Sequence, residues 1–400
     1  HIKNNNLMRL SEKIGNLTNL KEFHIVCDSL IELPKDMKNL INLKKLYIGC
    51  DNLKQLPEEI QNLINLDIHS SNLPKKIASL TNLKELRISC DNSKELPEEV
   101  GNLINLEKLN IINCYNLTKL PKEIGNLANL KQFNIVNCEN LMELPKEVGN
   151  LINLEKFNIK CDNLKQLPKE ICNLTNLKEL LINCNNLEEL PKDIGNLTKL
   201  KRLTIRCDKL VKLPKEICNF SKLENIEIAC ENLKELPPEI GNLKKLKYFT
   251  LWESNLKKFP KEFGNLINLE YFKIYSSYSL KEFPKEIANF TKLIHLTIEC
   301  YKMKELPREI GNLINLKSLH IKSANLKELP KEIKNLVNLE RIDIIWDGYA
   351  KELPNEILNF EKLKFIEIKK SGFIYKSFGR EYKIEKAKKK IKKNINKTKK

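Results

Sequence analysis

The sequence predicts an α/β solenoid, in which many copies of one short unit stack on one another. The first observation is a proline that follows Leu or Phe at intervals of 23 or 24 residues, with one interval of 17. The second is an alternating apolar segment before each proline, and the third is a Pro-x-Glu segment that begins a helical turn. One strand and one helical turn cannot bury their apolar side alone, so the units are expected to stack.

The repeated proline sets the number of units. Ser11 holds the same slot 23 residues before Pro34, which brings the count to sixteen. The prolines of the slot are Pro34, Pro57, Pro74, Pro97, Pro121, Pro145, Pro168, Pro191, Pro214, Pro237, Pro260, Pro284, Pro307, Pro330 and Pro354.

Each unit reads approximately LxxLxIxxCxNLxxLPKEIGNLxN. In its first half, residues such as Leu86 and Ile88 alternate with polar residues, which is the period of a short, half-buried strand. In its second half, Pro121 stands at a first helical position and Glu123 lies near the positive end of the turn. Gly125 then follows after about one turn of helix.

Two kinds of departure interrupt the rule. The four intervals of 24 residues gain their extra residue between the strand Ile and the next proline, in the turn that leaves the strand. The interval of 17, from Pro57 to Pro74, is six residues short. Placing Leu66 and Ile68 in a strand keeps that strand and shortens both flanks, so we expect a local kink there and no domain break.

The repeated sequence resembles that of the leucine-rich repeat family over roughly residues 7–368. Its LPxEIGNLxxLxxLxI form is similar to the intracellular repeats of Ras-pathway leucine-rich scaffolds and of plant disease-resistance receptors. The resemblance implies a leucine-rich repeat solenoid: a curved right-handed superhelix, with parallel strands on the concave face and short helical turns on the convex face. It also implies that the concave face binds other macromolecules and does no chemistry.

The charge divides the chain into a nearly balanced body and a basic tail. The net charge is +18, and residues 369–400 carry 14 Lys and Arg against two Glu, a net of +12 that leaves +6 for the rest. We therefore expect repeats over residues 1–368, a possible cap over 369–379, and a Lys-rich tail over 380–400. The apolar residues of the tail are spaced as a helical stripe, so the tail is either disordered or an amphipathic helix.

Ten of the twelve cysteines occupy one slot just after the strand, and Cys172 and Cys218 fill the glycine slot. The one-per-unit placement favours a buried ladder at the bend over disulfide pairing. Without a CxxC motif or histidines beside the thiols, the pattern does not favour a zinc site. Reduced thiols indicate an intracellular, cytoplasmic protein.

The sequence offers no enzyme motif. It contains no GxxxxGK[ST], GxGxxG, HExxH or GxSxG. Carboxylates such as Glu123, Glu147 and Glu170 recur in every unit, which is typical of a solvated face. His295 and His320 could approach one another on neighbouring strands, although no carboxylate partner was evident. We expect no catalytic residue, cofactor, metal or small-molecule substrate; an enzymatic role would need a catalytic domain outside the given sequence.

Aromatic residues concentrate between residues 248 and 280. Those in core slots, such as Phe249 and Phe272, replace the usual Leu or Ile. Others stand at positions that alternation directs out of the concave face, where adjacent strands would bring them together. This aromatic patch consists of Tyr248, Trp252, Tyr271, Tyr275 and, on the next strand, His295. It is either a binding hot spot or a set of rings that cover each other across a sheet.

These observations predict a non-enzymatic protein-interaction module that binds a protein partner on its concave face, in signalling or scaffolding. The alternative is a protein that acts on a membrane or nucleic acid through its basic tail, with the repeats as scaffold.

Overall fold

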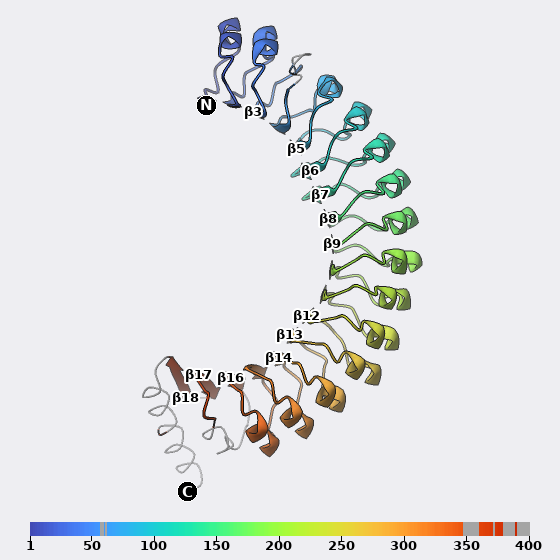
Figure 1. Cartoon of the computed structure of the whole chain (residues 1–400), viewed down its shortest axis with the longest axis vertical. Coiled ribbons are helices and arrows are strands. Elements are labelled where there is room, and N and C mark those ends of the chain that lie inside the picture. Colours follow the sequence, from blue (N-terminus) through green and yellow to red (C-terminus); the bar gives the residue numbers. More distant parts are fainter. Residues whose placement is uncertain (57–59, 61, 347–359, 371–372, 379–388, 390–400) are drawn as a thin grey trace. The chain divides into compact units, whose positions relative to one another are not determined.

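A computed structural model describes residues 1–400 except residues 57–59, 61, 347–359, 371–372, 379–388 and 390–400 (Figure 1). The chain forms two compact units, unit 1 over His1–Leu200 and unit 2 over Lys201–Lys400. Within each unit, the strands follow the concave side and short 3₁₀ turns follow the convex side (Figure 1). The predicted solenoid arrangement of strands and turns is confirmed.

The strands of unit 1 form a parallel sheet in which each strand pairs with the next in sequence. They are β1 (Ile2–Lys3), β2 (Glu22–Val26), β3 (Lys45–Gly49), β4 (Asn65–His69), β5 (Glu85–Ser89), β6 (Lys108–Ile112), β7 (Gln132–Val136), β8 (Lys156–Lys160) and β9 (Glu179–Asn183).

The strands of unit 2 repeat this arrangement and end with one antiparallel strand. They are β10 (Arg202–Arg206), β11 (Asn225–Ala229), β12 (Tyr248–Trp252), β13 (Tyr271–Ser277), β14 (His295–Cys300), β15 (Ser318–Ser323), β16 (Arg341–Trp346), β17 (Phe365–Lys370) and β18 (Phe373–Phe378). Strand β18 lies antiparallel to β17 and falls in the segment expected to cap the solenoid. The predicted tail, residues 380–400, lies outside the described residues except for Lys389.

Each 3₁₀ turn has five residues and begins directly after the slot proline or its substitute. The turns of unit 1 are η1 (Glu12–Asn16), η2 (Lys35–Asn39), η3 (Lys75–Ser79), η4 (Glu98–Asn102), η5 (Lys122–Asn126), η6 (Lys146–Asn150), η7 (Lys169–Asn173) and η8 (Lys192–Asn196). Those of unit 2 are η9 (Lys215–Asn219), η10 (Pro238–Asn242), η11 (Lys261–Asn265), η12 (Lys285–Asn289), η13 (Arg308–Asn312) and η14 (Lys331–Asn335).

The slot proline stands one position earlier than expected. Pro121 is the N-cap of η5, with φ −66° and ψ 144°, and its carbonyl accepts the first turn bond from the backbone N–H of Ile124 at 3.2 Å. Proline serves there because an N-cap residue contributes its carbonyl to the turn, and the missing N–H costs no intrahelical bond. Glu123 lies in the first turn, as predicted.

The core is a column of fully buried leucines and isoleucines, with the cysteine slot at its edge. All twelve cysteines are free and buried. Several thiols of the cysteine slot donate to the carbonyl of a strand Ile in the preceding repeat. For example, Cys138 Sγ lies 3.9 Å from Ile111 O, and Cys161 Sγ lies 3.9 Å from Ile135 O. Serines at 70, 254, 277 and 323, at most 3% exposed, take the same place where a cysteine is missing.

A second ladder, which the sequence analysis did not identify, runs along the other end of the strands. The second Asn of each GNLxN segment donates its side-chain amide to a backbone carbonyl of the preceding repeat. Asn129 Nδ2 lies 2.9 Å from Ile104 O, and Asn338 Nδ2 lies 2.8 Å from Ile314 O. Thiols at one end of the strands and amides at the other therefore satisfy backbone carbonyls that would otherwise be unpaired.

The irregular units keep their strands, as predicted. In the short unit, β4 pairs in register with β3 and β5, so the sheet of unit 1 is continuous there. In three of the four longer units, the inserted residue adopts a positive φ: 58° at Asn113, 56° at Asn137 and 54° at Ser276. The fourth insertion lies outside the described residues. Glu253, with φ 45°, forms a further irregularity in a unit of ordinary length.

Candidate functional site

The aromatic patch lies on β12, β13 and β14 of unit 2, on the face of the sheet that the core does not cover. Along β12, Phe249 and Leu251 are fully buried. The residues that alternate with them, Tyr248, Thr250 and Trp252, remain accessible. The strands therefore alternate as the sequence predicts, and every second residue is presented on the concave side.

Three rings of the patch form a continuous stack across the strands. Tyr248 is the cross-strand partner of Tyr271, and Tyr271 is the partner of His295. The ring centroids of each neighbouring pair lie 4.6 Å apart, with interplanar angles of 14° and 13°. Tyr248 is 37% exposed, and the other two side chains are half-buried. The expected cross-strand grouping is present for these residues.

The other two rings form a second stack at the end of the same strands. Trp252 pairs with Tyr275, and their ring centroids lie 4.0 Å apart at 19°. No ring contact joins this pair to Tyr248 or Tyr271 among the described residues, so the expected cluster of four rings is in fact two stacks. Residues four positions apart on a strand are separated by about 13 Å, which alternation alone does not reveal.

A middle row of polar side chains lies between the two stacks and was missed by the sequence analysis. Thr250, Lys273 and Thr297 are neighbours in register on β12, β13 and β14. Lys273 lies midway between Tyr271 and Tyr275 on one strand, and all three are half-buried on the same face. The Tyr-x-Lys-x-Tyr spacing in the sequence is the signal that marks this lysine.

Two lysines lie near the Tyr248–Tyr271–His295 stack. Burial lowers the pKa of His295 below its ordinary value, and the nearby Lys273 and Lys317 lower it further. Both effects disfavour the imidazolium, because the charged form loses hydration and faces two ammonium groups. Burial also raises the pKa of the Tyr275 hydroxyl. The site is therefore an aromatic surface with neutral rings and a positive centre.

The phenylalanines below the patch belong to the core, as predicted. Phe249, Phe263 and Phe272 are fully buried, and Phe259 is 7% exposed. Phe249 and Phe272 meet edge to face, with centroids 5.7 Å apart at 79°. Such packing holds β12 and β13 firmly, and the exposed rings therefore sit on a rigid support.

His320 does not lie beside His295, because the two occupy different rows of the strands. Its cross-strand partners are Thr297 and Asp343. The imidazole Nδ1 lies 3.0 Å from Asp343 Oδ2, and Nε2 lies 3.4 Å from Glu299 Oε1. The carboxylates contact opposite nitrogens of the ring, so they hold the imidazole in place and do not converge on a common point. Within the described residues, no His, Cys, Asp and Glu group is arranged to hold a metal.

A second, smaller ring cluster on the strand face of unit 1 was also not predicted. His24 stacks on Tyr47 with centroids 5.6 Å apart at 23°, and Tyr47 contacts the ring of His69 at 5.5 Å. Asp67 Oδ1 lies 3.4 Å from His69 Nε2 and 3.8 Å from Arg87 Nε. The charges of Asp67 and Arg87 compensate each other within this cluster, so it is less suited than the aromatic patch to meet a partner's charge.

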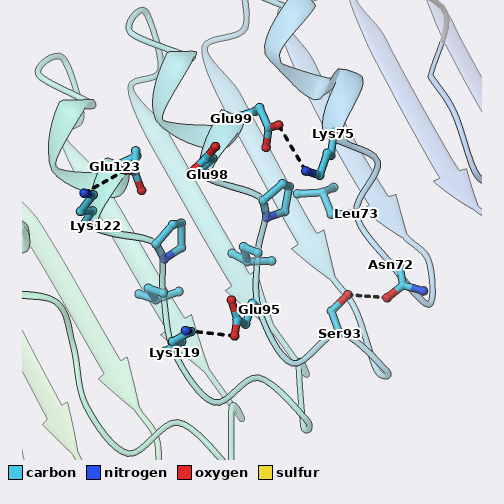
Figure 2. Close-up of a pocket in the computed structure, with 14 residues that line it drawn as sticks. Asn72, Leu73, Lys75, Ser93, Glu95, Glu98, Glu99, Lys119, Lys122 and Glu123 are labelled. Atoms are coloured by element: carbon cyan, nitrogen blue, oxygen red, sulfur yellow. Dashed lines mark hydrogen bonds and ion pairs between the residues drawn. The ribbon is translucent and has the colours of Figure 1, made fainter.

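The surface also carries a hollow beside the helical turns of unit 1. Figure 2 shows Leu73 on its wall, with ion pairs such as Lys75–Glu99 (3.8 Å) and Lys119–Glu95 (3.0 Å) around it. A similar hollow in unit 2 is lined by residues of three successive repeats at equivalent positions, among them Leu213, Leu236 and Pro260. A feature that recurs with the repeat is a consequence of stacking. Its repeated carboxylates, such as Glu99 and Glu123, are half-buried, so they are less solvated than the sequence indicated.

Within the described part of the chain, no helix has the length and apolar character needed to cross a membrane.

Comparisons with known proteins agree with this architecture. The leucine-rich repeat region profile matches residues 64–164, 122–209, 146–229 and 192–309, which together exceed half of the chain. A leucine-rich repeat protein of Leptospira interrogans is 29% identical to this chain and has a TM-score of 0.71. The match covers 98% of this chain and 92% of the Leptospira chain.

Two further solved structures are similar in fold alone. An internalin of Listeria monocytogenes is 18% identical with a TM-score of 0.53, covering 72% of this chain and 81% of its own. The Toll–Spätzle complex of Drosophila contains a chain that is 16% identical with a TM-score of 0.67, covering 88% of this chain and 54% of its own. No curated protein sequence matches the chain. The family profile, together with the stacked strands and turns, shows that the chain belongs to the leucine-rich repeat family.

Proposed function

We propose that the chain is a non-enzymatic interaction module that binds a protein partner through the aromatic patch on β12, β13 and β14. The observation that carries the proposal is the pair of ring stacks, Tyr248–Tyr271–His295 and Trp252–Tyr275, on the uncovered face of the sheet. Large aromatic side chains on a rigid surface supply much of the binding energy at protein interfaces, because they bury a large area while losing little conformational freedom.

The test is a replacement of Tyr248, Trp252, Tyr271 and Tyr275 together by Ser. We expect the variant to remain folded by circular dichroism and to lose the partners that wild-type protein captures from lysate of the source cell, measured by quantitative mass spectrometry. Tyr115→Ser is the matched control, because Tyr115 is an exposed tyrosine (41%) in a loop of unit 1. A folded quadruple variant that captures the same partners as wild type would refute the proposal.

The salt concentration separates this function from the alternative, in which the basic tail binds a membrane or nucleic acid. Contacts of aromatic rings persist in 0.5 M salt, whereas binding by a cluster of lysines weakens steeply with the logarithm of salt concentration. If the quadruple variant still captures its partners at low salt, and this binding disappears at high salt, the result would favour binding through the basic tail.

We further propose that the module works inside the cell, in the cytoplasm, in signalling or scaffolding. The support is the set of free, buried cysteines together with the resemblance of the repeated text to the repeats of intracellular scaffolds and receptors. Fractionation of the source cell, with alkylation of thiols before lysis, tests this. Recovery of the protein in the extracellular fraction would contradict it.

A further inference from the structure

Lys273 occupies the centre of the aromatic patch. It lies two residues from Tyr271 and two from Tyr275 on β13, and its neighbours in register are Thr250 and Thr297. The two threonines are half-buried and lie between the two ring stacks along their strands. A partner that covers both stacks must also cover the ammonium group of Lys273.

Three carboxylates near the patch have cationic or imidazole partners, whereas Glu253, beside Trp252, is exposed and its carboxylate pairs with no described residue. Glu227 Oε1 lies 2.7 Å from Arg206 Nη2, and Glu270 Oε1 lies 4.0 Å from Lys247 Nζ. Glu299 contacts the His320 ring, as described above.

Lys273, in contrast, makes no hydrogen bond or ion pair with any described residue. Its charge acts on His295: burial lowers the pKa of that imidazole, and the nearby Lys273 and Lys317 lower it further. The centre of the patch is therefore a cation that is not paired by any residue in the described part of the chain.

On the basis of the proposed function, we propose that the aromatic patch recognises a protein segment with an acidic side chain, whose carboxylate pairs with Lys273 between the two ring stacks. A neutral segment would cover the ammonium without replacing its hydration, and burial of an unpaired charge is unfavourable. A basic segment would add repulsion. An Asp or Glu flanked by apolar residues supplies the carboxylate to the centre and apolar surface to the rings.

The experiment uses a displayed library of random peptides, selected in parallel on four forms of the full chain. These forms are wild type, Lys273→Glu, the quadruple Ser variant and Lys160→Glu. Lys160 is the matched control, because it is a lysine without a described partner on the same face of the sheet in unit 1. We expect wild type and Lys160→Glu to enrich peptides with Asp or Glu next to aromatic or aliphatic residues.

Lys273→Glu is expected to reverse the preference towards Lys and Arg, and the quadruple Ser variant is expected to enrich nothing. For one selected peptide, Lys273→Met should weaken binding about tenfold, the size of one charge-assisted hydrogen bond. Replacing the peptide's Asp by Asn should cost wild type the same factor and Lys273→Met almost nothing.

The two proposals fail in different ways. In the first case, the selected peptides depend on the rings but are not enriched in Asp or Glu, and Lys273→Glu selects the same peptides as wild type. This result would overturn the role of Lys273 and leave the aromatic patch intact as a binding surface. Selection that is equal on wild type and on the quadruple Ser variant would overturn the proposed function itself.

Discussion

The rings of Trp252 and Tyr275 stack across β12 and β13 with their centroids 4.0 Å apart. The two side chains face each other because their strands pair in register, although the residues are 23 positions apart in the sequence. A double-mutant cycle with Trp252→Ala and Tyr275→Ala should give a coupling free energy of about 0.5–1.5 kcal/mol, measured by urea unfolding, as for other aromatic pairs. A coupling of zero would show that the two rings act independently.

The cysteine thiols should resist modification in the folded protein. Burial raises the pKa of Cys184, of Cys230 and of Cys300 to about 12, so these three form little reactive thiolate at pH 8. Hydrogen bonds with Cys138 and Cys90 lower the pKa of Cys114, which is protected by its burial alone. We expect slow labelling by iodoacetamide in buffer and labelling of all twelve cysteines in denaturant without reductant, counted by mass spectrometry. Paired cystines in protein prepared under alkylating conditions would contradict the free-thiol ladder.

The cysteine slot offers a comparison of two serines. Ser277 is fully buried and its hydroxyl has no partner, whereas Ser323 Oγ donates to Met303 O at 3.0 Å. An unpartnered buried hydroxyl is unfavourable, so Ser277→Ala should leave the free energy of unfolding unchanged or raise it by up to about 1 kcal/mol. Ser323→Ala removes a hydrogen bond and should lower it by about 1 kcal/mol. Chemical denaturation distinguishes the two, and equal losses would disprove the difference in bonding.

The sequence was sufficient for the features that follow from periodicity. Alternation placed Leu86 and Ile88 in a strand, and the shortened text around Leu66 and Ile68 still supplied β4. The same rule correctly directed Tyr248 and Tyr271 to one face and to neighbouring strands. These predictions succeed because a repeat imposes one backbone solution on every unit, and each strand inherits its register from the one before.

Features that depend on distance along a strand, or on side-chain direction, could not be predicted in this way. Alternation assigned Tyr248 and Trp252 to one face without separating them into two stacks. The contacts of His320 with Asp343 and Glu299 depend on how three side chains turn across neighbouring strands. The positive φ of Glu253 occurs in a unit of ordinary length, so the residue count gave no sign of it.

The charge environment of His295 gives the last prediction, a dependence of stability on pH. Burial, with Lys273 and Lys317, lowers the pKa of this imidazole in the folded protein below its unfolded value, which is about 6.5. In the interval between the two pKa values, the unfolded chain binds a proton that the folded chain does not. The contribution of His295 to the free energy of unfolding is therefore complete above the pKa of the unfolded state. It decreases as the pH falls through the pKa of the folded state.

Unfolding by urea between pH 7.5 and pH 5 should show this loss in wild type, and His295→Gln should show a weaker dependence on pH, because glutamine does not titrate. Lys273→Met removes one of the two nearby charges and should raise the pKa of His295, which NMR measures from the imidazole shifts. Lys160→Met is the control, because Lys160 lies on β8 of unit 1. A pKa of His295 that does not change in Lys273→Met would mean that the ammonium does not lie over the patch.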